Sequence, residues 1–281
     1  MINILVPTDF SPNANKALYY AAELAKVAGA KIVIIHVTNF THASMNEAVM
    51  LPQRLDKEVM DLANEKLDML ASDIREISMG QVEQQLYNGF VSDAIKQAAL
   101  ENKSDLIIMG TLGDSGLREK LFGSITAKII SHVNVPVLAI PLMYEWERPE
   151  NILLAINHIN EAPATFHVLT NLAQLLNVNL YITIFTNENK EGAAEYLQHR
   201  RDIETFSTRM QQQHPKLKII PVPIYGHNFE DAIKTYIAEN QTQVLAMVTH
   251  KRNFLESIFN KSMTRKMSYH TDIPLLSIPL H

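Results

Sequence analysis

The chain of 281 residues contains no cysteine. This absence excludes disulfide bonds, thiolate metal sites and cysteine nucleophiles, and it suits a reducing cytoplasm. The sequence also lacks an apolar stretch near the ~20 residues that span a bilayer. Its first nine residues, MINILVPTD, lack the basic region and long apolar core of a signal peptide. We therefore expect a cytoplasmic protein with no membrane segment.

A strong charge of either sign is absent as well. The formal net charge is −5, with 20% charged and 47% hydrophobic residues. A nucleic-acid-binding protein should show a basic excess or a basic face, so no nucleic-acid partner is expected. The composition is that of a globular protein rather than a disordered one. The length is sufficient for two domains of ordinary size.

An internal repeat runs through the sequence. Residues 93–96 (DAIK) recur as residues 231–234, a shift of 231 − 93 = 138 positions, and this register continues without a gap to the end. Roughly a third of the aligned positions are identical, which indicates an internal duplication. Residues 4–6 (ILV) match residues 152–154 (ILL) at a shift of 152 − 4 = 148. The second copy has therefore lost about ten residues in its middle.

The duplication predicts two domains, residues 1–142 and 150–281, joined by a linker over 142–150. Apolar runs and helical periodicities alternate in each copy. In the first copy, Ser11 is the expected N-cap of a helix that Gly29 ends. We expect strands over residues 2–7, 31–37, 82–87, 105–109 and 135–140, with further helices over 54–77, 92–101 and 124–132 and an irregular segment over 39–53. The second copy should have strands near 151–156, 179–185, 217–224, 244–248 and 274–278.

This α/β alternation predicts a five-stranded parallel sheet in each copy, covered by helices on both faces. Such sheets bind ligands beyond the carboxyl ends of the strands, where the strand order reverses. The site should therefore follow the first strand at Thr8 and Asp9, and the fourth strand from Gly110 onward.

The residues after the fourth strand suit a phosphate. Glycines stand at 110, 113 and 123, and Gly123-Ser124 opens a helix. Glycine lets backbone N–H groups approach a phosphate without a Cβ in the way, and a helix N-terminus adds free N–H groups and a positive dipole end. Ser124 and Thr126 can add hydroxyl donors. Asp9 is placed to accept from ribose hydroxyls or a base amine, as acids do in dinucleotide sites.

With these motifs the sequence resembles the universal stress protein (UspA-type) family across nearly its whole length, as a tandem member. Gly110, Gly113, Gly123 and Ser124 match the family's ATP-binding signature, G-x2-G-x9-G-S/T, at every spacing. The opening VPTDFS, the His36-Val37 strand end and the VPVLAIP ending are also similar. The resemblance implies two Rossmann-like (adenine nucleotide alpha hydrolase-like) domains packed as a pseudo-two-fold pair. Their last strands, 135–140 and 273–278, would meet across the axis.

The resemblance also implies a ligand, ATP or the related AMP or ADP, in the first domain. Asp9 and the Val37 backbone would hold the adenosine part, and the stretch from Gly110 to Thr126 the phosphates. Whether Mg²⁺ accompanies the nucleotide stays open, because no pair of acids is set for it. The expected binding residues are Pro7, Thr8, Asp9, Val37, Met109, Gly110, Gly113, Gly123, Ser124, Ile125 and Thr126.

Two departures from the family pattern bear on this site. Members often carry His-Gly-Arg in the loop where this chain has Leu-Gly-Asp at 112–114. The acid could weaken triphosphate binding, shift the preference toward AMP or a smaller adenosine ligand, or point to solvent. The second copy has Val248, Lys251 and Lys261 at the three glycine positions and Asn157 in place of Asp9. It is therefore expected not to bind nucleotide, or to bind something else.

Structural roles compete with binding roles at several positions. Ser124 and Thr126 persist as Ser262 and Thr264 in the copy without glycines, so capping and packing explain them at least partly. Asp9 could cap a turn. The histidines show no metal-ligand spacing, so no metal site is expected.

The motifs favour binding over catalysis. There is no G-x4-G-K-S/T loop and no nucleophile elbow, so no catalytic residue is assigned, although slow ATP hydrolysis stays open. The leading hypothesis is a non-catalytic stress-response regulator whose nucleotide occupancy biases a surface for an unknown protein partner, with 39–53 as the segment that orders. The alternatives are a nucleotide-independent interaction scaffold and, ranked last, a slow ATPase. Further pairing of chains into homodimers stays open.

Overall fold

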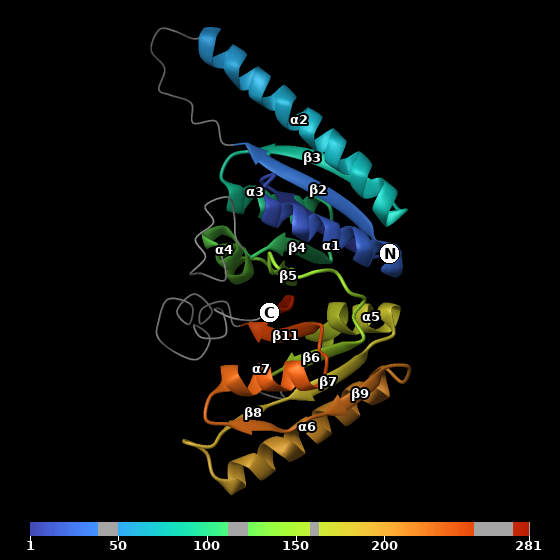
Figure 1. Ribbon diagram of the computed structural model, residues 1–281, viewed down its shortest axis with the longest axis vertical. Coiled ribbons are helices and arrows are strands. Elements are labelled where there is room, and N and C mark those ends of the chain that lie inside the picture. The colour runs from blue at the N-terminus through green and yellow to red at the C-terminus, as the bar shows by residue number, and fades with distance from the viewer. Residues whose placement is uncertain (39–49, 112–122, 158–162, 250–271, 281) are drawn as a thin grey trace.

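The computed structural model describes residues 1–38, 50–111, 123–157, 163–249 and 272–280 (Figure 1). In the first copy the elements follow the predicted order. They are β1 (Asn3–Thr8), α1 (Pro12–Ala28), β2 (Lys31–Thr38), α2 (Met50–Ser78), β3 (Val82–Asn88), α3 (Val91–Glu101), β4 (Leu106–Gly110), α4 (Ser124–His132) and β5 (Val137–Ile140).

The described part of the second copy follows the same order, with its second and third strands each in two pieces. It contains β6 (Asn151–Ala155), a 3₁₀ helix (Pro163–Phe166), α5 (His167–Leu176), β7 (Asn179–Thr183), β8 (Phe185–Asn187), α6 (Ala193–Gln213), β9 (Lys218–Pro221), β10 (Ile224–Gly226), α7 (Phe229–Glu239), β11 (Val244–Thr249) and β12 (Leu275–Pro279).

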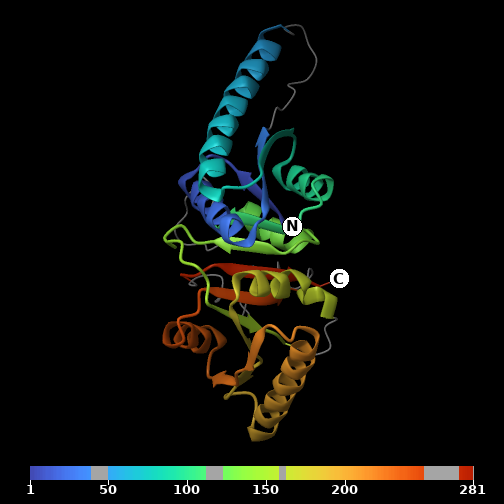
Figure 2. The ribbon, with the colours of Figure 1, turned by 90° about the vertical axis from the view of Figure 1, so that its right-hand side faces the viewer.

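The ten long strands form one sheet in the order β3-β2-β1-β4-β5-β12-β11-β6-β7-β9. Five strands belong to each copy and run parallel within it. The two halves join where β5 and β12 pair antiparallel, with Leu138 opposite Leu276. Figures 1 and 2 show the resulting two-domain stack, with the two last strands at its middle. The fold class and the meeting of the last strands are confirmed.

Helices cover both faces of this sheet. One apolar layer packs α1, α2, α5 and α6 against the strands, and the other packs α3, α4 and α7. The layers alternate along each strand: in β1, Ile4 and Val6 belong to the first layer and Leu5 to the second. Strands buried on both faces explain the nearly continuous apolar runs that the sequence shows.

The expectation of simple second and third strands in the second copy is wrong. Each of these strands breaks, and the outer pieces, β8 and β10, pair with each other in a separate two-stranded parallel sheet. Pro221 ends β9 and Pro223 precedes β10. Proline cannot donate to a strand ladder, so these two residues interrupt the pairing at this point.

Helix α1 has the predicted ends. The Ser11 hydroxyl accepts a hydrogen bond from the Ala14 backbone N–H at 3.2 Å, and Gly29 adopts a left-handed φ of 64° after the last turn. Asn177, 148 positions later, adopts φ 56° after α5. The two copies therefore end this helix in the same way, because glycine and asparagine tolerate the left-handed conformation best.

The expectations for α2 need two corrections. The helix begins at Met50, so residues 50–53 are helical rather than irregular, and 39–49 lie outside the described residues. The apolar periodicity of the helix expected over 54–77 also predicts that Val59 and Leu62 face the core, but they are 48% and 58% exposed. The residues that pack are Ala63, Leu67, Ala71 and Ile74. Figure 2 shows the reason, since the N-terminal part of α2 extends beyond the sheet.

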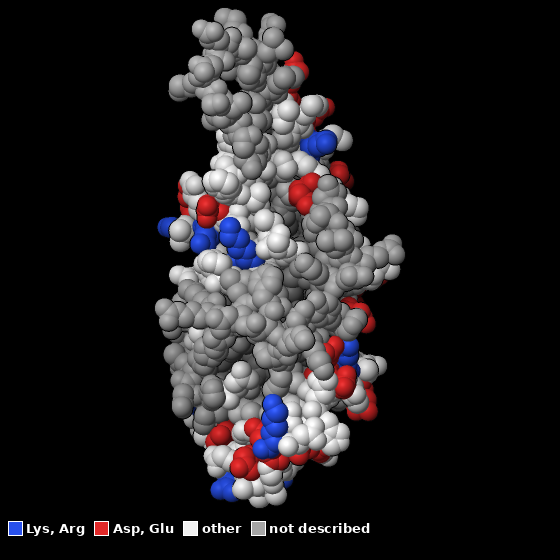
Figure 3. All heavy atoms as spheres, turned by 90° about the vertical axis from the view of Figure 1, so that its left-hand side faces the viewer, with Lys and Arg blue, Asp and Glu red and all other residues white. Residues whose placement is uncertain are grey.

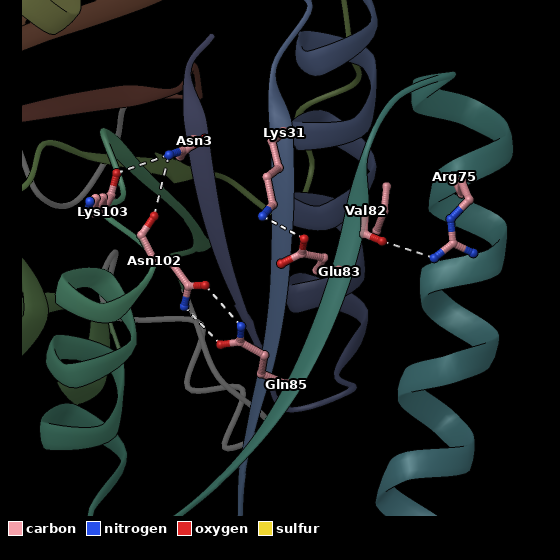
Figure 4. A network of polar contacts seen from close by, with 8 residues as sticks. All are labelled: Asn3, Lys31, Arg75, Val82, Glu83, Gln85, Asn102 and Lys103. Atoms are coloured by element: carbon pink, nitrogen blue, oxygen red, sulfur yellow. Dashed lines mark hydrogen bonds and ion pairs between the residues drawn. The ribbon is translucent and has the colours of Figure 1, made fainter.

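The two copies share a set of side-chain hydrogen bonds at the start of their first strands. The Asn3 side-chain amide donates to the carbonyl oxygens of Asn102 (3.4 Å) and Lys103 (3.3 Å). Figure 4 shows this contact beside the reciprocal amide pair of Gln85 and Asn102. In the second copy the Asn151 amide donates in the same way to the carbonyl oxygens of Asn240 and Gln241, each at 3.2 Å.

The linker packs onto the first domain. The Trp146 ring lies edge-on to that of Tyr20 on α1, with centroids 4.7 Å apart, and Lys16 forms an ion pair with Glu145 at 2.7 Å. Burial raises the pKa of the Tyr20 hydroxyl well above its usual range. The linker is therefore part of the folded structure. Among the described helices, none is both long and apolar enough to cross a bilayer.

Candidate functional site

A cavity of about 220 Å³ opens at the carboxyl ends of β1 and β4, beside the start of α4. This is the point where the strand order of the first domain reverses, and such points are where parallel sheets bind ligands. Ten of the eleven expected residues line it: Pro7, Thr8, Asp9, Val37, Met109, Gly110, Gly123, Ser124, Ile125 and Thr126. The eleventh, Gly113, lies outside the described residues.

Asp9 lies exposed at the mouth of the cavity. Its Oδ1 accepts a hydrogen bond from the Ser11 backbone N–H at 3.0 Å, so the turn-capping role that the sequence left open is present. The Thr8 hydroxyl accepts from the Phe10 N–H in the same turn, also at 3.0 Å. Phe10 adopts a left-handed φ of 61°, which non-glycine residues rarely adopt outside special sites. The turn therefore fixes the position of the Asp9 carboxylate.

Gly110 is required for packing against α1. A Cβ at this position would lie 2.7 Å from the side-chain Cγ of Asn13 and 2.8 Å from its backbone oxygen. The sequence interpretation, that this glycine lets the backbone approach a phosphate, is therefore incomplete. The second copy carries Val248 here, and its α5 begins at His167, seven positions later than the start of α1 in the same register.

Thr126 also has a structural role. Its side chain is only 3% exposed, and its hydroxyl donates to the carbonyl oxygen of Gly110 at 2.8 Å. This contact joins the first turn of α4 to the end of β4. Ser124 is exposed beside the cavity. Thr126 therefore has the packing role that the sequence left open beside a role in binding.

The start of α4 presents its backbone toward the cavity. Its N-cap is Gly123, and no described side chain caps the helix. The Gly123 N–H itself donates to the Thr111 carbonyl oxygen at 2.6 Å. The N–H groups at positions 124–126 have no partner within the helix, and the positive end of the helix dipole lies here. Such an end can hold an anionic group.

Five lining residues were not expected: Ala14, Ile35, His36, Val91 and Ile95. Ile35 lies two positions before Val37 on β2, and Val91 and Ile95 are four positions apart on α3. The two-residue period of a strand places Ile35 on the same face of β2 as Val37, and the helical period places Val91 and Ile95 on the same face of α3. These periods could have predicted the three residues. They make the interior of the cavity apolar.

His36 lies at the mouth. Its Nδ1 donates to the Thr8 carbonyl oxygen at 2.8 Å, because a carbonyl oxygen can only accept. Its ring contacts that of Phe10, with centroids 4.4 Å apart. The Lys66 ammonium lies 5.4 Å from the Phe10 ring centroid, which places a positive charge near this end of the first domain.

In the second copy, aromatic rings occupy the equivalent positions. Phe185 aligns with Val37 at the shift of 148, and Phe229 aligns with Val91 at the shift of 138. Their rings form an edge-to-face pair with centroids 5.3 Å apart, and both pack against the apolar layer under α7. Two phenylalanine rings in contact take up more of this space than two valines do, which is a second physical difference between the copies besides the lost glycines.

Within the described part of the chain, no group of three or more histidine, aspartate or glutamate side chains could hold a metal ion. Figure 3 shows acidic and basic side chains interspersed over the described surface of one face. The arrangement around the cavity, with an apolar interior, one carboxylate at the mouth and a helix N-terminus, is suited to hold a ligand with an apolar ring, hydroxyl groups and an anion.

Comparison with known proteins identifies the family and the fold of the chain. The model of the universal stress protein family matches residues 1–141. Universal stress protein YxiE of Bacillus subtilis is 31% identical over 143 residues, covering 49% of this chain and 97% of that protein. Universal stress protein Slr1230 of Synechocystis is 23% identical over 299 aligned positions, covering 99% of both chains. A universal stress protein from Archaeoglobus fulgidus has the same fold, with a TM-score of 0.77, 19% identity and coverage of 99% of this chain and 98% of that one.

Proposed function

The chain belongs to the universal stress protein family, and on that premise we propose that its first domain binds an adenine nucleotide, ATP or the related AMP or ADP. The protein acts in the cytoplasm as a non-catalytic regulator of the stress response. The observation that carries this proposal is the convergence of ten expected binding residues on one cavity at the switch point of the first sheet.

Each part of a nucleotide has a matching part of the cavity. The base would lie against the apolar interior formed by Ile35, Val91 and Ile95. The Asp9 carboxylate would accept hydrogen bonds from the ribose hydroxyls, and the N-terminus of α4 would hold the phosphates. A volume of about 220 Å³ is below the ~300–1,000 Å³ of ordinary ligand pockets. It therefore encloses the nucleoside part, and the phosphates extend toward α4.

A binder without a catalytic group can act only through different affinities in two states of the protein. Among the described residues that line the cavity, none is a lysine that could contact a terminal phosphate, and the described part of the chain has no cluster of acids for a metal. Fast ATP hydrolysis is therefore not part of the proposal. The nucleotide instead biases which surface is available to a protein partner.

The test uses the second copy as a template for closing the cavity. The full chain is purified and denatured, and the released nucleotide is identified by mass spectrometry. The double variant Val37→Phe/Val91→Phe introduces the ring pair of the second copy. We expect nucleotide to co-purify with the parent protein and to be lost from this variant. Val59→Phe on α2, at a 48% exposed position, is the matched control and should keep the nucleotide.

Two results would contradict this proposal. If the parent protein binds no adenine nucleotide at millimolar concentration, or if the ring pair leaves binding unchanged, the proposal is wrong. Gly113→Lys, which copies Lys251 of the second domain, gives a separate variant on the phosphate side. A linear release of phosphate that Asp9→Asn abolishes would instead favour a slow ATPase.

A nucleotide-independent scaffold is the second candidate. It is favoured by the continuous ten-stranded sheet, in which the second domain pairs with β5 as a permanent partner, and by the linker packed on α1. In that case, variants that close the cavity would keep the binding of protein partners. Parallel partner-capture experiments with the parent protein and the closed variant distinguish the two functions.

A further inference from the structure

A second cavity, of about 490 Å³, lies in the second domain. It opens beside the carboxyl ends of β8 and β10, the two strands that left the main sheet, and beside the start of α6. The break in the second copy has thus formed a new pair of parallel strand ends. Because ligands bind beyond the carboxyl ends of parallel strands, this cavity is a candidate ligand site that is independent of the nucleotide site.

Two tyrosine rings form the walls of this cavity. Tyr196 comes from α6 and Tyr225 from β10, and their rings are nearly perpendicular, with centroids 5.6 Å apart. Tyr225 is 56% exposed, so part of its ring is accessible from the solvent side of the cavity. A ring with an accessible face attracts cations through its quadrupole.

Carboxylates line the same cavity. Glu191 is held in place, since its Oε2 accepts from the Asn187 backbone N–H at 2.6 Å. Glu188 lines the cavity too, and its Oε2 lies 3.3 Å from the Nδ1 of His227 in a solvent-exposed pair. The surrounding charge is therefore mainly negative, and it complements the aromatic walls.

The N-terminus of α6 does not reverse this preference. A bare helix N-terminus would attract an anion, but here Oε2 of Glu195 accepts from the Gly192 N–H at 2.9 Å. Gly192 lines the cavity, so the positive end of this helix is already neutralised by a carboxylate. The site is thus built for a positive ligand rather than a phosphate.

We propose that this cavity binds a small organic cation carrying an alkylammonium group, held against the exposed ring of Tyr225 and paired with Glu191. The volume lies within the ~300–1,000 Å³ range of small-molecule sites, which favours a small ligand over a protein surface. The second domain would then have exchanged a nucleotide site for a cation site during its divergence from the first.

The test uses choline and its neutral carbon isostere, 3,3-dimethylbutan-1-ol, with the full chain. Tyrosine ring resonances are followed by NMR, with Tyr196 and Tyr225 assigned through the variants. Choline should shift these two resonances in a saturable way, and the isostere should bind at least about threefold more weakly, because the cation–π attraction is lost. n-Butylamine tests whether a primary ammonium is preferred to a quaternary one; weaker binding of both cations than of the neutral isostere would overturn the proposal.

Variants separate the ring from the fold. Tyr225→Leu should weaken choline binding by about three- to fivefold, whereas Tyr225→Phe keeps the ring and the affinity. Tyr19→Leu, at a 42% exposed tyrosine of the first domain, is the matched control and should bind as the parent does. Equal binding of choline and its isostere, an unchanged affinity in Tyr225→Leu, or shifts only at tyrosines outside the cavity would each overturn the proposal.

Discussion

The hydroxyl of Thr126 donates a hydrogen bond to the carbonyl oxygen of Gly110 at 2.8 Å. This bond joins the helix that begins the proposed phosphate site to the strand that ends at it. Two residues that the sequence assigns to ligand binding therefore also stabilise the first domain by contacting each other. Binding and stability must be measured separately at these positions.

Replacing Thr126 should reduce stability in the absence of any ligand. In Thr126→Val the buried Gly110 carbonyl loses its donor, which should cost about 1–3 kcal/mol of unfolding free energy. Thr126→Ser keeps the hydroxyl and should lose much less. Urea unfolding of nucleotide-free protein measures both. Equal stability of the valine variant and the parent would contradict the structural role.

Gly110→Ala should destabilise the first domain through a steric clash. The new Cβ would lie 2.7 Å from Asn13 Cγ, and overpacking of this kind costs about 1–3 kcal/mol. Gly226→Ala is the matched control. The nearest atom to its new Cβ would be the Cβ of Ala232 at 3.4 Å, which is an ordinary van der Waals contact. The midpoints of urea unfolding of the two variants give the comparison. If Gly110→Ala is as stable as the parent protein, α1 can shift to make room for the new Cβ.

The acid sensitivity of the second domain should depend on Glu195. Hydrogen bonds from its own backbone N–H and from that of Gly192 lower the pKa of this carboxyl. A lowered pKa in the folded state stabilises the fold above the unfolded pKa of about 4.3, and this stability is lost as the pH falls through the folded pKa. In Glu195→Gln this pH-dependent part should be missing. Urea midpoints measured from neutral pH down to about pH 3 test it, and parallel curves for the two proteins would contradict it.

The isolated first domain should pair with itself. In the full chain β5 is covered by β12, so residues 1–142 alone would leave a strand edge with unpaired N–H and C=O groups. We expect this fragment to be a dimer by light scattering, and added residues 150–281 to compete for the same edge. A fragment that is monomeric at concentrations where the full chain is well behaved would show that the edge is blocked in another way.

Much of the fold follows from local sequence patterns. The repeat, the order of helices and strands, the caps of α1 at Ser11 and Gly29, and the start of α4 at Ser124 all agree with the structure. These features depend on residues close together in the chain. The cavity lies where the sequence predicts a site, because alternating strands and helices leave one reversal of strand order in each domain.

Other features depend on contacts between distant segments. The sequence placed Val59 and Leu62 on a buried face, but the sheet does not reach that part of α2. The ring pair of Phe185 and Phe229 brings together residues that are 44 positions apart (229 − 185). No local periodicity reports whether two such side chains fill a cavity or leave it open.

The sequence by itself determined the duplication, the α/β class and the place of the first-domain cavity, because periodicity and connection rules act locally. Only the tertiary structure decided what each residue does there. Gly110 is small because Asn13 on α1 lies against it, and the second copy formed a cavity at Tyr196 and Tyr225 after its strands broke. Close packing between segments far apart in the chain sets these roles. Local sequence patterns do not show which distant segments come into contact.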